Sequence, residues 1–301
     1  MTLVEEIQTL KKEKDAVILA HYYVNPEVQA IADYIGDSFY LSRLAATLKE
    51  QTIVYCGVSF MAESAKILCP EKTVLMPEVS ADCAMAHMAQ VELVHKARKE
   101  YDDLAVVCYI NSRADLKQYC DVCVTSSNAV KIVKKLKNKN IFFTPDKNLG
   151  AYVASQVPEK HFIMNPGYCP IHNDVNKQEI LDLKAEHPNA LMLAHPECPA
   201  SILEEAVYID STSGIIDYAT KSDCQEFIIC TEKGVAYELQ KRNPNKKFYF
   251  TKTEPICTDM KKITLENIAH VLKTGDNEIF VDEELAIKSK KPLELMLELG
   301  K

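Results

Sequence analysis

Residues 191–197 read L-M-L-A-H-P-E, an apolar run that ends in a histidine and a glutamate two positions apart. The same pattern occurs twice earlier, as V-I-L-A-H-Y-Y at 17–23 and as V-V-C-Y-I-N at 106–111. In each copy a short apolar run, typical of a buried strand, leads into polar residues. The markers at which the three runs end, positions 21, 109 and 195, are 88 and 86 residues apart. The chain therefore repeats itself three times, and this repeat decides the fold.

Each copy continues in the same way beyond its first strand. A short amphipathic helix is followed by an apolar segment that ends in hydroxyl side chains, and then by two more strands, each flanked by a helix. The hydroxyl residues, each 17 residues after its marker, are Ser38, Ser126 and Thr212. The cysteines that follow the fourth strands, 86 and 88 residues apart, are Cys83, Cys169 and Cys257.

This alternation of strands and helices predicts an α/β fold of three pseudo-threefold-related α/β/α units, each with a short parallel sheet. The expected units are residues 1–86, 87–172 and 173–258, and residues 259–301 are expected to form a helical tail that packs back on the body. Functional groups gather at the carboxyl ends of parallel strands. We therefore expect the strand-end side chains of all three units to face one central active site.

The composition of the 301 residues argues against several classes of protein. The formal charge is −8 and no long basic run occurs, so a nucleic-acid partner is not expected. No stretch approaches the roughly 18 apolar residues of a membrane span, and residues 1–14 predict a charged amphipathic helix rather than a signal peptide. These features predict a cytoplasmic protein without membrane association. In that reducing compartment the eleven cysteines should be free thiols or metal ligands.

The three cysteines in register predict a metal centre on the pseudo-threefold axis. Three thiolates suit zinc or an iron–sulfur cluster. A cuboidal four-iron cluster has threefold symmetry through one corner, so three cysteines would leave one iron open. Such an iron is a Lewis acid for hydroxyl, carboxylate or carbonyl oxygens. A zinc site with an open position stays an alternative, although it suits ligands so far apart in the sequence less well.

The other cysteines lie outside this register. Cys198, next to Glu197, has no counterpart in the other units and is expected to be a bystander. Cys120 and Cys123 form a C-x-x-C pair that could bind metal or act in redox chemistry, but only one unit has it, so we expect a structural role. The cysteines expected to be ordinary structural thiols are Cys56, Cys69, Cys108, Cys224 and Cys230.

The polar residues at the strand ends predict an acid–base site for an anionic substrate. The hydroxyl residues could simply cap helices, but helix starts with free N–H groups also bind phosphate or carboxylate. His21 and His195 share one register, and Glu197 would supply a general base beside an imidazole. Lys221, after the third hydroxyl cluster, is explained equally well as a solvated lysine and as a functional one.

Several longer motifs complete the pattern. The first unit contains A-H-Y-Y-x-x-P-E-V-Q and D-x-I-G-D-S; the second contains Y-I-N-S-x-A-x-x-K, D-V-C-V-T-S-S-N-A and P-G-Y-C; the third contains A-H-P-E-C and D-S-T-S-G-I. Together they resemble the quinolinate synthase family of bacterial NAD biosynthesis, over nearly the whole chain. The resemblance implies a 4Fe-4S cluster held by three cysteines, and the condensation of iminoaspartate with dihydroxyacetone phosphate to quinolinate, with release of phosphate and two waters. It also implies a transient partner that supplies iminoaspartate, either L-aspartate oxidase or aspartate dehydrogenase.

The resemblance assigns roles to residues that match the motifs. The cluster ligands are similar to Cys83, Cys169 and Cys257. The substrate-binding positions match His21, Ser38, Tyr109, Asn111, Ser126, His195, Glu197 and Thr212. The catalytic positions match Tyr23, Glu197, His21 and Tyr109, of which Tyr23 and Glu197 would move protons. Some members of the family carry C-x-x-C-x-x-C at the last ligand, but T-D-M follows Cys257 here, which argues against a dithiol switch.

Three rival functions stay open on the residues alone. A hydro-lyase with another substrate would share the cluster and the open iron. A redox-sensing or metal-storage protein would use the many thiols without catalysis. A sugar-binding α/β protein of the periplasmic type would contain no iron. Iron content and quinolinate formation from the two substrates distinguish these rivals.

Overall fold

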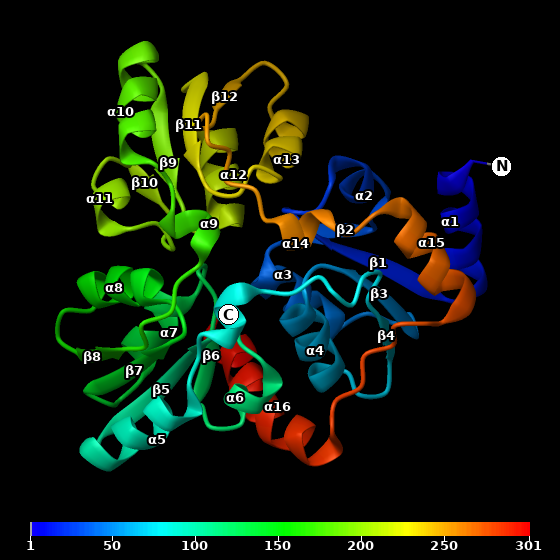
Figure 1. The fold of residues 1–301 in the computed structure, drawn as a ribbon, viewed down its shortest axis with the longest axis horizontal. Helices are drawn as coiled ribbons and strands as arrows, with labels where there is room; N and C mark the ends of the chain where they lie inside the picture. Colours follow the sequence, from blue (N-terminus) through cyan, green and yellow to red (C-terminus); the bar gives the residue numbers. More distant parts are fainter. Residues whose placement is uncertain (1) are drawn as a thin grey trace.

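The computed structural model describes residues 2–301, which form three α/β units around a common centre (Figure 1). The first unit consists of α1 (Leu3–Glu13), β1 (Ala16–His21), α2 (Pro26–Ile31), β2 (Tyr34–Gly36), α3 (Ser38–Ala45), β3 (Thr52–Cys56), α4 (Ser59–Leu68) and β4 (Thr73–Leu75), followed by a 3-10 turn, Ala84–His87. The second consists of α5 (Val91–Glu100), β5 (Leu104–Tyr109), α6 (Ala114–Lys117), β6 (Val122–Val124), α7 (Ala129–Lys135), β7 (Asn140–Thr144), α8 (Lys147–Gln156), β8 (His161–Met164) and α9 (Pro170–Asn173).

The third unit and the tail complete the chain. The third unit consists of α10 (Lys177–Glu186), β9 (Leu191–Ala194), α11 (Ala200–Leu203), β10 (Tyr208–Ile209), α12 (Thr212–Lys221), β11 (Glu226–Cys230), α13 (Val235–Arg242), β12 (Lys247–Tyr249) and α14 (Thr258–Lys261). The tail consists of α15 (Leu265–Thr274) and α16 (Glu283–Leu299). The expected helix over residues 1–14 is α1, and Met1 lies outside the described residues.

Each unit folds into a parallel sheet with the same strand order. Across residues 2–301 the three four-stranded sheets run β2-β1-β3-β4, β6-β5-β7-β8 and β10-β9-β11-β12. The first strand of each unit therefore lies inside its sheet, and the second lies at one edge. This confirms the expected α/β fold of three repeated units, while the boundaries between the units stay a prediction.

The first strands bring the markers of the repeat to one edge of each sheet. β1 and β5 are buried along their whole length, as expected for parallel strands covered by helices on both faces. His21 pairs with Gly36 and Tyr109 pairs with Val124, so each strand end lies beside the start of a hydroxyl-rich segment. The register thus places the polar ends of strands and the hydroxyl residues at the same edge.

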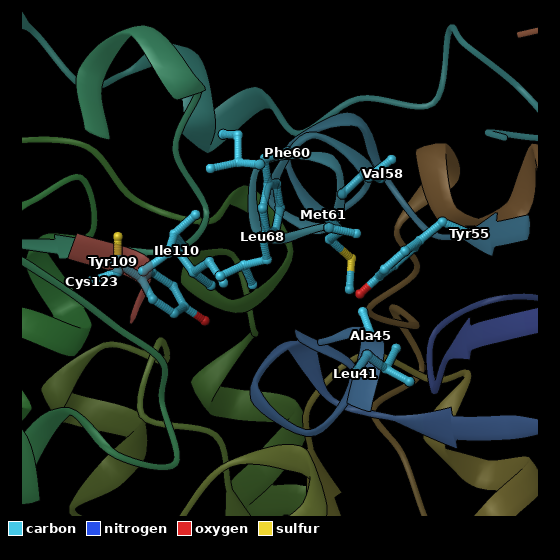
Figure 2. Close-up of a cluster of buried hydrophobic side chains, with 14 of the residues drawn as sticks. Leu41, Ala45, Tyr55, Val58, Phe60, Met61, Leu68, Tyr109, Ile110 and Cys123 are labelled. Carbon is cyan, nitrogen blue, oxygen red and sulfur yellow. The ribbon is translucent and has the colours of Figure 1, made fainter. Parts of the chain in front are cut away.

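The hydrophobic core is less symmetric than the strand order. Units one and two share one continuous cluster of buried side chains, to which the tail contributes Leu293 and Met296. Figure 2 shows Phe60 and Leu68 of α4 beside Ile110, which comes from the second unit. Unit three has two smaller clusters on either side of its sheet, and one of them includes Tyr22 of unit one. Units one and two therefore share the larger apolar core, and unit three contacts unit one through the smaller cluster around Tyr22.

The two tail helices lie against the first two units. α15 packs along α1, and α16 lies against α4, α6 and β6 (Figure 1). The Ser289 hydroxyl of α16 is buried and donates to the carbonyl oxygen of Ala114, 2.8 Å away. Within residues 2–301, no helix has the length and apolar character needed to cross a membrane.

Candidate active site

The three units enclose one central cavity of about 270 Å³. All twelve side chains expected at the centre line it, although they come from positions spread over residues 21–257: His21, Tyr23, Ser38, Cys83, Tyr109, Asn111, Ser126, Cys169, His195, Glu197, Thr212 and Cys257. Every unit contributes to the wall of the cavity. The structure thus brings the predicted residues together, while the roles assigned to them stay predictions.

The three cysteines in register differ from most of the other thiols. Cys83, Cys169 and Cys257 are partly exposed to the cavity. Burial in the protein raises the pKa of each thiol, to about 12 for Cys83. Thiols of this kind lose their protons when a metal centre binds them, so metal binding would release protons. Three soft sulfur donors around one cavity fit an iron–sulfur cluster or zinc.

The two histidines adopt the same arrangement in different units. The backbone N–H of Tyr23 donates to Nδ1 of His21 at 3.2 Å, and the backbone N–H of Glu197 donates to Nδ1 of His195 at 3.3 Å. Burial lowers the pKa of both imidazoles to about 3, so both are neutral near pH 7. Because Nδ1 accepts in both rings, the proton lies on Nε2. His195 Nε2 is 3.2 Å from the Ser126 hydroxyl, and the shared arrangement presents two N–H donors at the centre.

A continuous chain of hydrogen bonds connects the two tyrosines. The Tyr109 hydroxyl donates to Glu197 Oε1 at 2.5 Å, and Glu197 Oε2 is 2.7 Å from Nδ1 of His172. His172 Nε2 is 3.0 Å from the Thr231 hydroxyl, which lies 2.8 Å from the Tyr23 hydroxyl. The threonine, the histidine and the glutamate thus stand in the order of a hydroxyl, a base and an orienting carboxylate.

The charges along this chain are set by its neighbours. Burial alone would raise the pKa of Glu197, but His172 and His195 beside it, together with hydrogen bonds from His172 and Tyr109, lower that pKa. Glu197 is therefore a carboxylate, although it is almost completely buried. Burial raises the pKa values of Tyr23 and Tyr109 well above their usual range, so both hydroxyls keep their protons and can donate.

His172 and Thr231 were missed by the sequence analysis. His172 lies three residues after Cys169 in α9, where the other units have Ala86 and Met260. Thr231 directly follows β11 and resembles an ordinary strand end. Neither residue recurs in register, so the repeat gave no signal for them. The spacing C-P-I-H after a predicted ligand is the one local signal that could have found His172.

The hydroxyl residues occupy positions other than helix caps. The caps of α3 and α12 are the preceding residues Asp37 and Ser211, so Ser38 and Thr212 are the first helical residues, and capping does not explain them. Ser126 lies in the turn before α7, three residues ahead of its start. The backbone N–H of Ala129 nevertheless donates to the carbonyl oxygen of Thr125 at 2.9 Å, which matches the bonds from Leu41 to Asp37 and from Ile215 to Ser211 in the other units.

The bystander residues lie outside the cavity wall. Cys198 is completely buried behind β9 and its thiol faces the carbonyl oxygen of Cys230. The side chain of Lys221 is 80% exposed at the end of α12, which supports the solvated alternative. Cys120 and Cys123 are buried next to Cys108, and Cys123 is the strand partner of Cys108.

One further group of atoms could hold a single metal ion. Ligand atoms of Cys169, His172 and Glu197 all lie within 4.8 Å of one another. However, two ligands of a tetrahedral zinc ion lie about 3.4 Å apart. The separation of 2.7 Å between His172 Nδ1 and Glu197 Oε2 is that of a hydrogen bond. In this geometry the three residues form a hydrogen-bonded set rather than a closed metal site.

The neutral histidines predict acid sensitivity of the fold. The pKa values of His21 and His195 are lowered to about 3 in the folded protein, against about 6.5 in an unfolded chain. The unfolded state therefore binds protons first, so stability is full above pH 6.5 and falls between pH 6.5 and 3. Each histidine should contribute a slope of up to about 1.4 kcal/mol per pH unit. Melting temperatures of the cluster-free protein across this range measure the slope.

A matched pair of variants isolates this effect. His195→Gln should show a shallower loss of stability on acidification than the unchanged protein. His270→Gln is the control, because His270 is exposed on α15. Identical slopes for both variants would contradict the assignment of acid sensitivity to the buried imidazoles.

Gly167 of the P-G-Y-C motif allows the Cys169 loop to approach the loop after β7. A Cβ atom at this position would lie 2.7 Å from the carbonyl oxygen of Pro145 and 2.8 Å from Cβ of Met88. Gly167→Ala should therefore destabilise the protein by about 1–3 kcal/mol and displace the Cys169 loop. Thermal melting measures the destabilisation, and an unchanged melting temperature would show that the loop accommodates the methyl group.

Fold and site together define a class of protein: an α/β enzyme in which three repeated units enclose a cavity lined by thiols and acid–base groups. A family model described as quinolinate synthetase A protein matches residues 5–298. The chain belongs to the quinolinate synthase family. This membership decides against the non-catalytic alternatives.

Relatives of similar length support the same assignment. The quinolinate synthase of Fusobacterium nucleatum subsp. nucleatum is 56% identical over 98% of this chain and 99% of its own length. The quinolinate synthase of Clostridioides difficile is 53% identical over 97% of this chain and 96% of its own length. That of Caldicellulosiruptor saccharolyticus is 50% identical over 98% and 97%.

Proposed function

We propose that this chain condenses iminoaspartate with dihydroxyacetone phosphate to quinolinate, releasing one phosphate and two waters. The observation that carries the proposal is the single cavity that joins a thiol from each unit to the hydrogen-bonded chain from Tyr23 to Tyr109. The substrates carry two carboxylates and a phosphate, and the neutral histidines and the hydroxyl residues offer donors to such groups.

The three thiols would hold a 4Fe-4S cluster through Cys83, Cys169 and Cys257. Their partial exposure to one cavity and their origin in three units fit a cluster with threefold symmetry. When bound, such a cluster supplies one open iron that acts as a Lewis acid in dehydration. The residues around it carry out the binding and the proton transfers.

The chain of hydrogen bonds supports a role in proton transfer. Glu197, a buried carboxylate, can take a proton from the triose or from the imine carbon. Tyr23 can deliver its proton to a leaving hydroxyl and recover one through Thr231 and His172. In this direction His172 would take a proton from Glu197 at Nδ1 and give one to Thr231 from Nε2, so that a proton removed at Glu197 reaches Tyr23 without entering bulk water.

The binding roles of the histidines and the hydroxyl residues are proposed from their positions in the cavity wall. His21 and His195 would donate Nε2–H to substrate carboxylates, and Ser38, Ser126 and Thr212 would hold the phosphate or a second carboxylate. We also propose that iminoaspartate, which hydrolyses readily, reaches the cavity from a transient partner such as L-aspartate oxidase or aspartate dehydrogenase.

The direct test is an anaerobic assay with the two substrates, with quinolinate measured after separation of the products. We expect quinolinate and phosphate in equal amounts. Protein with an intact cluster that forms no quinolinate from these substrates would contradict the proposed reaction and favour a hydro-lyase with another substrate.

A further inference from the structure

The backbone N–H of each of the three cysteines Cys83, Cys169 and Cys257 donates a hydrogen bond to a carboxyl group. The N–H of Cys83 donates to Asp82 Oδ1 at 2.7 Å, and the N–H of Cys169 donates to Asp146 Oδ2 at 3.1 Å. The N–H of Cys257 donates to Glu232 Oε1, also at 3.1 Å. The contact therefore occurs once in each unit.

A second contact recurs beside the first. The residue two positions before each cysteine accepts a backbone hydrogen bond from the segment that directly follows the third strand of its unit. The three bonds run from Ser59 N to Ala81 O at 3.0 Å, from Lys147 N to Gly167 O at 2.8 Å, and from Lys233 N to Pro255 O at 2.9 Å. Asp146 and Glu232 directly precede the donors of units two and three, so they occupy equivalent positions in the repeat.

The first unit reaches the same contact by another route. The equivalent position holds Val58, which cannot accept a hydrogen bond through its side chain. Here the carboxylate comes from Asp82, next to the cysteine, and the Ser59 hydroxyl donates to it at 2.5 Å. Nε2 of His87 lies 2.6 Å from the other oxygen of Asp82. The first unit thus also has a carboxyl acceptor for the N–H of its cysteine, although the residue that supplies it lies at another position of the repeat. This indicates that the site itself requires the acceptor.

Burying two of these carboxyl groups costs free energy. Asp146 and Glu232 are completely buried, and burial raises the pKa of both carboxyl groups, to about 8 for Asp146. Burial of a carboxyl group that lacks a charged partner is unfavourable. Glu232 is compensated by Lys261 at 3.0 Å. No lysine, arginine or histidine of residues 2–301 pairs with Asp146, and its oxygens accept the N–H groups of Leu149 and Cys169 instead. The carboxyl oxygens of Asp146 are thus directed at backbone N–H groups, one of which belongs to Cys169.

We propose that Asp82, Asp146 and Glu232 are positioning residues that fix the three cysteine loops in the geometry that retains the cluster. This inference rests on the cluster proposed above. Partners that orient metal ligands from behind commonly change metal affinity about 10- to 100-fold when they are removed. In this chain the carboxylate orients the main chain of each ligand, since it accepts the backbone N–H.

The experiment compares alanine and amide variants of Asp82, which is only partly buried and therefore safest for folding. Asp82→Ala removes the acceptor, whereas Asp82→Asn keeps an oxygen for the N–H of Cys83. The matched control is Asp121→Ala, because Asp121 Oδ2 accepts the backbone N–H of Val106 at 2.7 Å, at the amino end of the strand rather than at the cavity. Asp146→Ala and Glu232→Ala test the other units.

The readout is the loss of the visible cluster absorbance of anaerobic holoprotein under an iron chelator, with thermal melting measured in parallel. We expect the cluster lifetime to fall about 10- to 100-fold in Asp82→Ala, Asp146→Ala and Glu232→Ala. It should be unchanged in Asp121→Ala and largely restored in Asp82→Asn.

An unchanged lifetime in Asp82→Ala would overturn the proposal, and so would an equal loss in Asp121→Ala, which would show that general destabilisation is the cause. If the two fully buried sites do not fold as alanine variants, the Asp82 pair decides alone. If the protein without any substitution holds no cluster, the proposed cofactor is wrong, and this inference is wrong with it.

Discussion

Replacing Glu197 by glutamine is expected to lower kcat by about 10²- to 10⁴-fold while the iron content stays unchanged. The amide keeps the size of the carboxylate, but it cannot accept a proton. It also breaks the chain at its centre, because Glu197 accepts from Tyr109 with one oxygen and contacts His172 with the other. Steady-state kinetics of anaerobic protein, with iron and sulfide analysis, measure both effects.

A surface carboxylate serves as the control for this substitution. Glu205→Gln removes a charge that pairs with Lys184 far from the cavity wall, and it should leave kcat unchanged. Full activity in Glu197→Gln would remove Glu197 from proton transfer. Loss of iron together with activity would show that Glu197 supports the cluster instead.

Alanine at any one of Cys83, Cys169 and Cys257 is expected to abolish the cluster and the activity together. Each sulfur would be a ligand from a different unit, and the two that remain would leave two irons of the proposed cluster without a protein ligand. Iron and sulfide content and the visible spectrum after anaerobic reconstitution measure the loss.

Cys198→Ala is the matched control, because Cys198 lies next to Glu197 in the sequence but its thiol is buried away from the cavity. This variant should keep the cluster and lose at most a little stability from the small cavity that it creates. Equal loss of cluster in Cys198→Ala would contradict the assignment of ligands by their register in the repeat.

The repeat made the fold and twelve residues of the cavity wall predictable. Strand ends such as His21, Tyr109 and His195 combine a buried apolar run with a polar terminus, and this local signal survives in the sequence of every unit. Since the sheets are parallel and have one strand order, equivalent strand ends must lie at equivalent places. The same equivalence of positions predicts that Cys83, Cys169 and Cys257 lie around one centre.

What the sequence could not predict depends on contacts between units or on departures from the repeat. His172 and Thr231 come from different units and meet across the cavity wall, with no counterpart in register. Asp82 reaches the backbone of Cys83 from a position that differs from its equivalents. The shared core of units one and two arises because α4 packs against the second unit, which no pattern within a single unit reveals.

We propose that three cysteines, one from each unit, hold a four-iron cluster with one iron open to substrate. Mössbauer spectroscopy of anaerobic, iron-57-labelled protein, recorded before and after addition of quinolinate, is the sharpest test of this arrangement. One iron in four should have a distinct environment, and its signal alone should change when quinolinate binds. Four equivalent irons that do not respond to quinolinate, or protein that binds no iron, would contradict it.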